Sequence, residues 1–263
     1  MKKILSLILA LLMVLSFTGC SEEEVAEALD IAVMVLEEME DLEAQEEQAE
    51  EAMPEDVLDV PVGEGELTAL EEIPPFSDVA YVPVNGNVPF FMEEEYTTES
   101  YEFYSELDDL GRCGVTMACI GVDIMPTEDR GEIGSVKPSG WQSVKYDIVE
   151  GKYLYNRCHL IGFQLAGENA NKRNLITGTR YLNIEGMLPF ENLVADFVKE
   201  TKEHVLYRVT PIYEGDNLVA SGVLLEGLSM EDGGEEICFC VYAYNNQPGI
   251  EIDYATGESK LAQ

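Results

Sequence analysis

Residues 155–191 contain the most informative stretch of the chain, YNRCHLIGFQLAGENANKRNLITGTRYLNIEGMLPFE. Its first part lies in a β-rich segment, Tyr146–Phe163, and its last part opens a segment with helical spacing, Ile184–Thr201. Between them lies a run rich in Asn, Gly and basic residues. This order predicts strands, a polar connection and a helix.

The flanking segments predict more strands and little helix. A hairpin is expected within Tyr81–Phe90, around an Asn-Gly pair, and a short helix within Glu93–Leu110. Residues Pro126–Trp141, rich in glycine and proline, predict a long irregular loop. Further strands are expected at 115–123, 204–213, 217–228 and 236–244. This succession predicts an α+β fold.

The sequence has only two histidines, so any histidine-dependent chemistry falls on His159 or His204. His204 follows Glu203 at a predicted helix-to-strand junction, where a solvated turn residue is the simpler interpretation. His159 is flanked by Asn156 and Arg157 and precedes the amide-rich run. A lone histidine in a strand is more often structural, but these neighbours favour a functional role.

The amide-rich run and the helix after it offer hard oxygen ligands. Asn183 lies at the start of the predicted helix and Glu191 eight residues later, on roughly the same face. Amide and carboxylate oxygens suit Mg²⁺, which keeps several waters and needs few protein ligands. The alternative interpretation is a helix-capping Asn and a surface Glu, which the spacing alone leaves open.

These residues resemble bacterial DNA/RNA non-specific endonucleases of the ββα-metal (His-Me finger) class. The family's Asp-Arg-Gly-His signature has its counterpart in Asn156-Arg157-Cys158-His159, and its later Asn, Asn and Glu positions are matched by Asn174, Asn183 and Glu191. The resemblance extends over about residues 78–255. It implies an antiparallel sheet with a ββα-metal active-site motif within the α+β fold.

The resemblance also implies a role for each matched residue. His159 would be the general base, and Asn183 the direct ligand of a single Mg²⁺ ion, with Mn²⁺ as a substitute. Glu191 would hold metal-bound waters, and Asn174 would orient the histidine or its water. Phosphodiester hydrolysis needs these functions: an activated water, neutralised charge on phosphorus and a stabilised leaving oxygen.

Two arginines complete the implied site. Arg157 would contact phosphate, and Arg130 in the predicted loop would meet the charge that develops on phosphorus. The sequence departs from the family at Asn156 and at Cys158, where the family has Asp and Gly. A cysteine beside the base adds bulk, so reduced activity is one expectation.

The charge is unevenly distributed along the 263 residues, which carry a net charge of −37. Residues 21–75 have 21 acidic residues and no Lys or Arg, whereas residues 130–183 have eight basic and four acidic residues. The whole chain is therefore no general polyanion binder. A locally positive stripe on an acidic body is compatible with phosphate binding at one site.

The first 20 residues, MKKILSLILALLMVLSFTGC, have a basic start, an apolar run and a small-residue exit. This pattern is typical of a secretory signal and is short for a membrane-spanning helix. Its end resembles a bacterial lipobox, in which Cys20 would carry the lipid. The alternative is an ordinary cleaved signal with an incidental cysteine. The location expected is extracytoplasmic, lipid-anchored to the cell membrane or secreted.

Three regions follow from these patterns: a lipoprotein signal at 1–20, an acidic low-complexity tether at 21–75 and an endonuclease domain at 76–263. Within the tether, about 22–52 has helical spacing of apolar residues, and the remainder is typical of a disordered linker. A spacer is favoured over a partner-binding helix.

The sequence thus predicts a Mg²⁺-dependent non-specific endonuclease acting on DNA and on RNA. Its partners would be the nucleic acid and, through the lipid anchor, the membrane, and no dedicated protein partner is indicated. The alternative, from another class, is a catalytically weak nucleic-acid-binding surface lipoprotein.

Overall fold

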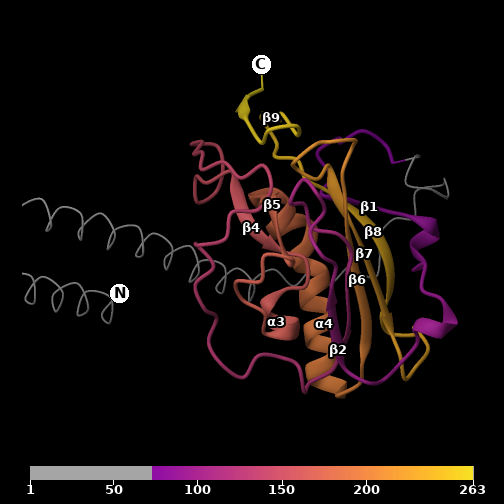
Figure 1. Ribbon diagram of the computed structural model, residues 1–263. Coiled ribbons are helices and arrows are strands. Elements are labelled where there is room, and N and C mark those ends of the chain that lie inside the picture. The colour runs from indigo at the N-terminus through magenta and orange to yellow at the C-terminus, as the bar shows by residue number, and fades with distance from the viewer. Residues whose placement is uncertain (1–72, 263) are drawn as a thin grey trace, which may run out of the picture. The chain divides into compact units, whose positions relative to one another are not determined.

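The computed structural model describes residues 73–262, and an antiparallel sheet of six strands lies at their centre (Figure 1). Its spatial order is β1-β8-β7-β6-β3-β2. The strands are β1 (Tyr81–Pro83), β2 (Tyr101–Tyr104), β3 (Thr116–Ile120), β6 (Val205–Ile212), β7 (Gly222–Ser229) and β8 (Cys238–Tyr244). The strands predicted at 115–123, 204–213, 217–228 and 236–244 are therefore confirmed.

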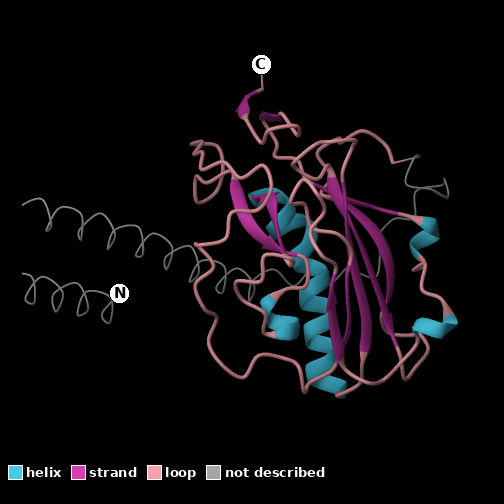
Figure 2. Ribbon diagram, in the orientation of Figure 1, coloured by secondary structure: helices cyan, strands magenta, loops and turns pink. Residues whose placement is uncertain are grey.

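The sheet separates two apolar clusters, because successive side chains of a strand point to opposite faces. Phe239 and Val241 of β8 belong to the larger cluster, together with residues of helix α4 (Leu188–Thr201). Cys240 and Tyr242 belong to the cluster on the other face, which the incoming chain around Val84 completes. Helix α4 accordingly lies along one face, and the 3-10 turns η3 (Asn85–Asn87) and η4 (Glu93–Glu95) lie on the other side (Figure 2).

A separate hairpin of β4 (Tyr155–His159) and β5 (Leu175–Thr179) packs beside α4 in the larger cluster. A short helix, α3 (Phe163–Ala166), lies between the two strands in sequence. After β5, a π-helical segment η5 (Leu182–Met187) continues directly into α4. This β-β-α order confirms the predicted α+β fold and the helix predicted over 184–201. A small hairpin of β9 (Ile250–Ile252) and β10 (Ser259–Leu261) lies near the C-terminus.

The hairpin predicted within Tyr81–Phe90 is wrong. The turn forms, with positive φ angles at Asn85, Gly86 and Asn87, but β1 pairs with β8 instead of with the chain that follows the turn. Pro89 cannot donate a ladder hydrogen bond, and the next amide, that of Phe90, donates to the Glu226 carboxylate across the sheet. The local turn signal therefore did not determine the pairing.

The short helix predicted within Glu93–Leu110 is also wrong. Only the 3-10 turn η4 forms at its start, and strand β2 follows at the sheet edge, paired with β3. Tyr101 and Phe103 are aromatic residues that favour the pleated surface of a strand over a helix. In the segment Tyr146–Phe163, strand forms only over β4, and turns precede it.

The predicted signal segment, with Cys20, lies outside the described residues, as does nearly all of the tether. Their boundaries at residues 20 and 75 remain predictions. Among residues 73–262, no helix combines the length and the apolarity needed to cross a membrane.

Candidate active site

His159 is the last residue of β4, and only 6% of it is exposed. Its Nε2 atom lies 2.9 Å from the main-chain oxygen of Asn169. Because a carbonyl oxygen can only accept, Nε2 carries the proton of the neutral ring. Nδ1 is then the basic nitrogen, and it lies 3.4 Å from Nη2 of Arg130. The basic atom thus faces the loop that carries Arg130.

The surroundings of His159 keep its ring neutral. Burial, and then the charge of Arg130, lower its pKa from the ordinary 6.5 to about 4, against hydrogen bonds to the main chain of Asn169 and Glu168. A neutral imidazole with an unprotonated Nδ1 is able to accept a proton at neutral pH. The strand, the loop and the charge therefore together keep an unprotonated ring nitrogen at this position.

The depressed pKa predicts that His159 makes the fold less stable in acid. Because the folded-state pKa is about 4 and the ordinary value 6.5, the unfolded chain takes up this proton first as the pH falls. The contribution is complete above pH 6.5 and is lost toward pH 4, by about 3 kcal/mol. Denaturant unfolding at pH 7 and pH 4.5 should show a smaller acid loss in His159→Ala than in the wild type. Equal losses would contradict this assignment.

Asn169 organises the base and the loop at the same time. Its main-chain oxygen accepts from His159, and its Oδ1 accepts from the backbone N of Gly131 at 2.6 Å. Gly131 directly follows Arg130, so one asparagine contacts both His159 and the backbone next to Arg130. In the sequence, Asn169 is only one of several amides in the amide-rich run. Its hydrogen bond with Gly131 joins residues that are 38 positions apart.

Arg157 braces the irregular loop predicted over Pro126–Trp141, which the structure confirms. Its Nε donates to the oxygen of Val136 at 2.6 Å and its Nη2 to that of Gly134 at 2.8 Å. The guanidinium also lies 4.2 Å from the ring centroid of Trp141. Two of its donors are therefore committed to the protein, and phosphate contact by Arg157 stays a prediction.

Asn174 is fully buried, and both polar atoms of its side-chain amide bond to the backbone of one residue. Its Oδ1 accepts from the backbone N of Ile161 at 2.8 Å, and its Nδ2 donates to the oxygen of Ile161 at 2.9 Å. Ile161 lies two residues after His159. Asn174 therefore fixes the backbone at the end of β4, which is a way to orient the histidine without touching its ring.

Asn183 and Glu191 lie on the helix that follows β5. Asn183 is in the π-helical segment, and its amide makes no hydrogen bond with any residue between 73 and 262. Glu191 lies in the first turn of α4, where burial raises its pKa to about 7 against the charge of Arg130 and a hydrogen bond from Gln164. A Cβ at position 162 would collide with the Glu191 carboxylate, so a larger residue there would displace that carboxylate.

These donors fit a hydrated Mg²⁺ ion better than a metal held in a protein cage. In the described part of the chain, no group of three or more His, Cys, Asp or Glu side chains could enclose an ion. An uncommitted amide oxygen at Asn183 and an acidic group at Glu191 are hard ligands, the kind that Mg²⁺ prefers. The π-helical turn at Asn183 is a feature that often accompanies functional sites.

Two further polar side chains near this group were not predicted as site residues. The Tyr207 hydroxyl is completely buried and has no hydrogen-bond partner within residues 73–262, and burial and then the Glu191 charge raise its pKa. Arg180, one residue after β5, is 7% exposed, and no group in the described part of the chain accepts from its Nε. His204, by contrast, pairs with Glu231 at 2.6 Å, apart from these groups.

Cys158 lies beside the base in sequence but points into the core. It is fully buried, and its Sγ occupies the space that a Cβ at Gly178 would need on the neighbouring strand. Burial raises its thiol pKa, so it stays protonated at neutral pH. The glycine of β5 thus accommodates the bulk that the family signature lacks.

Cys158→Gly should therefore keep cleavage rates within about threefold of the wild type or raise them. It should lower the free energy of unfolding by about 1–2 kcal/mol, because it leaves a cavity and places a glycine within a strand. Urea denaturation and plasmid cleavage measure the two effects separately. Complete loss of activity in a folded variant would reveal a role of the thiol itself.

Comparison with known proteins agrees with this geometry. A family model described as DNA/RNA non-specific endonuclease matches residues 92–230. A deoxyribonuclease of Streptococcus dysgalactiae subsp. equisimilis is 31% identical over 110 residues, which are 40% of this chain. The chain spans only 32% of that relative's length.

Solved structures extend the likeness over more of the chain. NucA from Streptococcus agalactiae, with a magnesium ion bound, superposes with a TM-score of 0.62 at 27% identity, covering 72% of this chain and 90% of NucA. Sda1 nuclease, with a zinc ion bound, gives 0.59 at 27% identity, covering 70% and 96%. The matched residues 92–230 include the whole β-β-α unit, and the chain belongs to the DNA/RNA non-specific endonuclease family.

Proposed function

We propose that this protein is a Mg²⁺-dependent endonuclease that hydrolyses phosphodiester bonds of DNA and of RNA with little sequence preference. The observation that carries the proposal is the buried, neutral His159, whose unprotonated Nδ1 faces Arg130 at 3.4 Å and would take a proton once the guanidinium turns to phosphate. The free amide of Asn183, on the helix that follows the same hairpin, adds a metal ligand.

His159 acts as the general base. Its Nδ1 takes a proton from the attacking water, while Nε2–H keeps its hydrogen bond to Asn169. That main-chain oxygen holds the ring in place and stabilises the imidazolium that forms. The low pKa means that the protonated ring returns its proton readily, so the base is regenerated after each turnover.

Asn183 would hold the ion directly, and Glu191 would position water around it. When bound, Mg²⁺ neutralises phosphate charge and assists the leaving oxygen. Asn174 contributes by fixing the backbone after His159. Arg130 lies within 3.4 Å of the base and is placed to meet the negative charge that develops on phosphorus.

Low sequence preference is expected from these contacts. Each proposed group binds phosphate, metal or water, and none would read a base edge. The excess of basic residues within 130–183 supplies local attraction for the backbone, while the acidic remainder of the chain keeps non-specific affinity low.

The apolar first 20 residues, ending at Cys20, support an extracytoplasmic position with a lipid on that cysteine. Substitution of Cys20 by Ser should release the protein from membranes or leave its precursor uncleaved. Fully soluble wild-type protein with the signal removed would contradict the lipid anchor.

Nicking of supercoiled plasmid and degradation of a long RNA test the enzymatic proposal. The purified protein should cut both with Mg²⁺ and with Mn²⁺ and should stop with a chelator. Binding of nucleic acid without cleavage under any metal would favour the alternative of a catalytically weak binding lipoprotein, to which the Asn156 and Cys158 departures point.

A further inference from the structure

We propose that Arg180 binds a backbone phosphate of the nucleic acid at the active site. The proposal rests on the proposed endonuclease function and adds a positively charged group to it. Arg180 is largely buried, no carboxylate of residues 73–262 pairs with it, and it lies three residues before Asn183.

The burial of Arg180 is unusual because no ion pair within residues 73–262 compensates its charge. Only 7% of the residue is exposed, yet among the described residues no carboxylate pairs with it and no acceptor takes a hydrogen bond from its side chain. Only Nε is both shielded from solvent and unpartnered, so the terminal nitrogens, which also lack partners, reach solvent. A buried unpaired cation destabilises a fold, and a bound anion would remove that cost.

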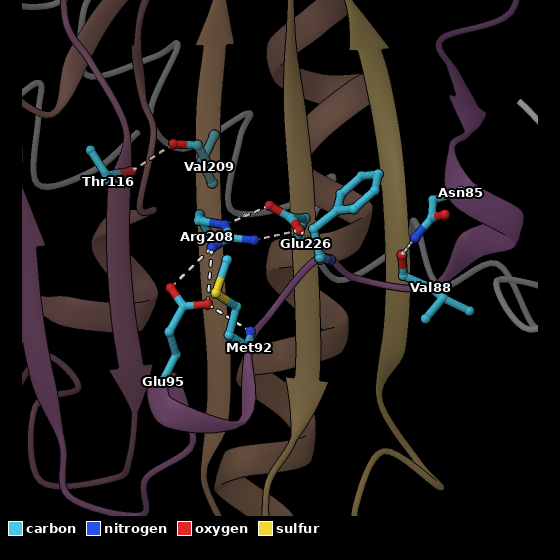
Figure 3. A network of polar contacts seen from close by, with 9 residues as sticks. Asn85, Val88, Met92, Glu95, Thr116, Arg208, Val209 and Glu226 are labelled. Atoms are coloured by element: carbon cyan, nitrogen blue, oxygen red, sulfur yellow. Dashed lines mark hydrogen bonds and ion pairs between the residues drawn. The ribbon is translucent and has the colours of Figure 1, made fainter. Parts of the chain in front are cut away.

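Arg208 shows how this fold treats an arginine that has a structural role. Its Nε and Nη2 donate to Glu226 at 2.6 and 2.8 Å, and Nη1 lies 3.2 Å from Glu95 (Figure 3). Its guanidinium also lies over the ring of Phe91. Arg157 is likewise bonded to two carbonyl oxygens. Unlike Arg208 and Arg157, Arg180 donates no side-chain hydrogen bond to any residue between 73 and 262.

The position of Arg180 connects it to the proposed catalytic groups. The helical segment begins at this residue, and Asn183 follows three residues later, in the π-helical segment η5. Burial raises the pKa of the Cys158 thiol, and the charges of Glu191, Arg180 and Arg130 all act on it as well. Arg180, Arg130 and Glu191 thus all lie within electrostatic range of one buried thiol, on the strand that ends at His159.

A guanidinium is suited to this place. Its planar fork matches two oxygens of one phosphate, and it stays charged at every relevant pH. Phosphate binding would supply the missing counter-charge, and because every nucleotide offers a phosphate, it would not discriminate between bases. Arg180 would then stabilise the negatively charged transition state more than it stabilises the protein without substrate.

Arg180→Met tests this role because methionine fills a similar apolar space without charge. The variant should unfold at the same temperature as the wild type or higher, while its kcat/KM for plasmid nicking should fall about 10²–10³-fold. Arg180→Lys, which keeps the charge but not the fork, should fall between the two. Lys199→Ala, which removes one exposed charge from the end of α4, is the control and should behave like the wild type.

A second readout needs no turnover. With a chelator present, 10–100 mM inorganic phosphate should raise the melting temperature of the wild type more than that of Arg180→Met. Nicking by Arg180→Met within threefold of the wild type, equal phosphate effects, or a strong loss of stability in this variant would each overturn the inference. Should the wild type cut no nucleic acid, the endonuclease proposal fails, and the phosphate comparison still decides on Arg180.

Discussion

His159→Ala is expected to lower the rate of plasmid cleavage by about 10³-fold while leaving Mg²⁺ affinity within about threefold of the wild type. The variant loses the nitrogen that accepts the proton, but the oxygens assigned to the ion, on Asn183 and Glu191, stay in place. Cleavage rates at saturating metal, together with calorimetric titration of Mg²⁺ and Mn²⁺, measure both quantities on the same samples.

His204→Ala is the matched control for the loss of a histidine. His204 bonds to Glu231 and has no contact with the proposed base, so its removal should leave cleavage and metal affinity unchanged. If both histidine variants lost activity equally, a general effect on folding would explain the result, and His159 would lose its assignment as the base.

The parts of the fold that the sequence predicts well are those in which local pattern and long-range packing agree. The side chains of strands β6 to β8 alternate between the two buried faces of the sheet. Helix α4 has one continuous apolar face, which packs into the larger of the two clusters. In both cases the residue spacing directly reflects burial. The segment 81–104 is different, because β1 and β2 are edge strands whose partners, β8 and β3, are chosen by contacts distant in sequence.

The same distinction applies to the site. His159, Asn183 and Glu191 are proposed from residue type and spacing, and they lie on the predicted strand and helix. Asn169 and Arg180 are identified only by geometry. Asn169 works through a carbonyl oxygen, which every residue has, and Arg180 is notable for the partners it lacks. No sequence pattern encodes either property.

Asn183→Ala is expected to weaken metal binding, and to slow catalysis because less metal is bound. The Mg²⁺ concentration for half-maximal cleavage should rise at least tenfold, since even residues that only support a ligand change metal affinity by about 10–100-fold. The amide has no hydrogen bond among the described residues, so its removal should leave the free energy of unfolding nearly unchanged. A large destabilisation would mean that Asn183 caps the helix instead.

Glu191→Ala should show a milder form of the same defect, because this carboxyl would act through water around the ion. Comparing the three variants by metal titration and by cleavage rate separates the two roles: loss of rate with intact affinity identifies the base, and loss of affinity identifies the ligand. If His159→Ala lost metal binding and Asn183→Ala kept it, the roles assigned to the strand and the helix would be exchanged. The histidine would then be the ligand, and the β-β-α unit would need another base within reach of Arg130.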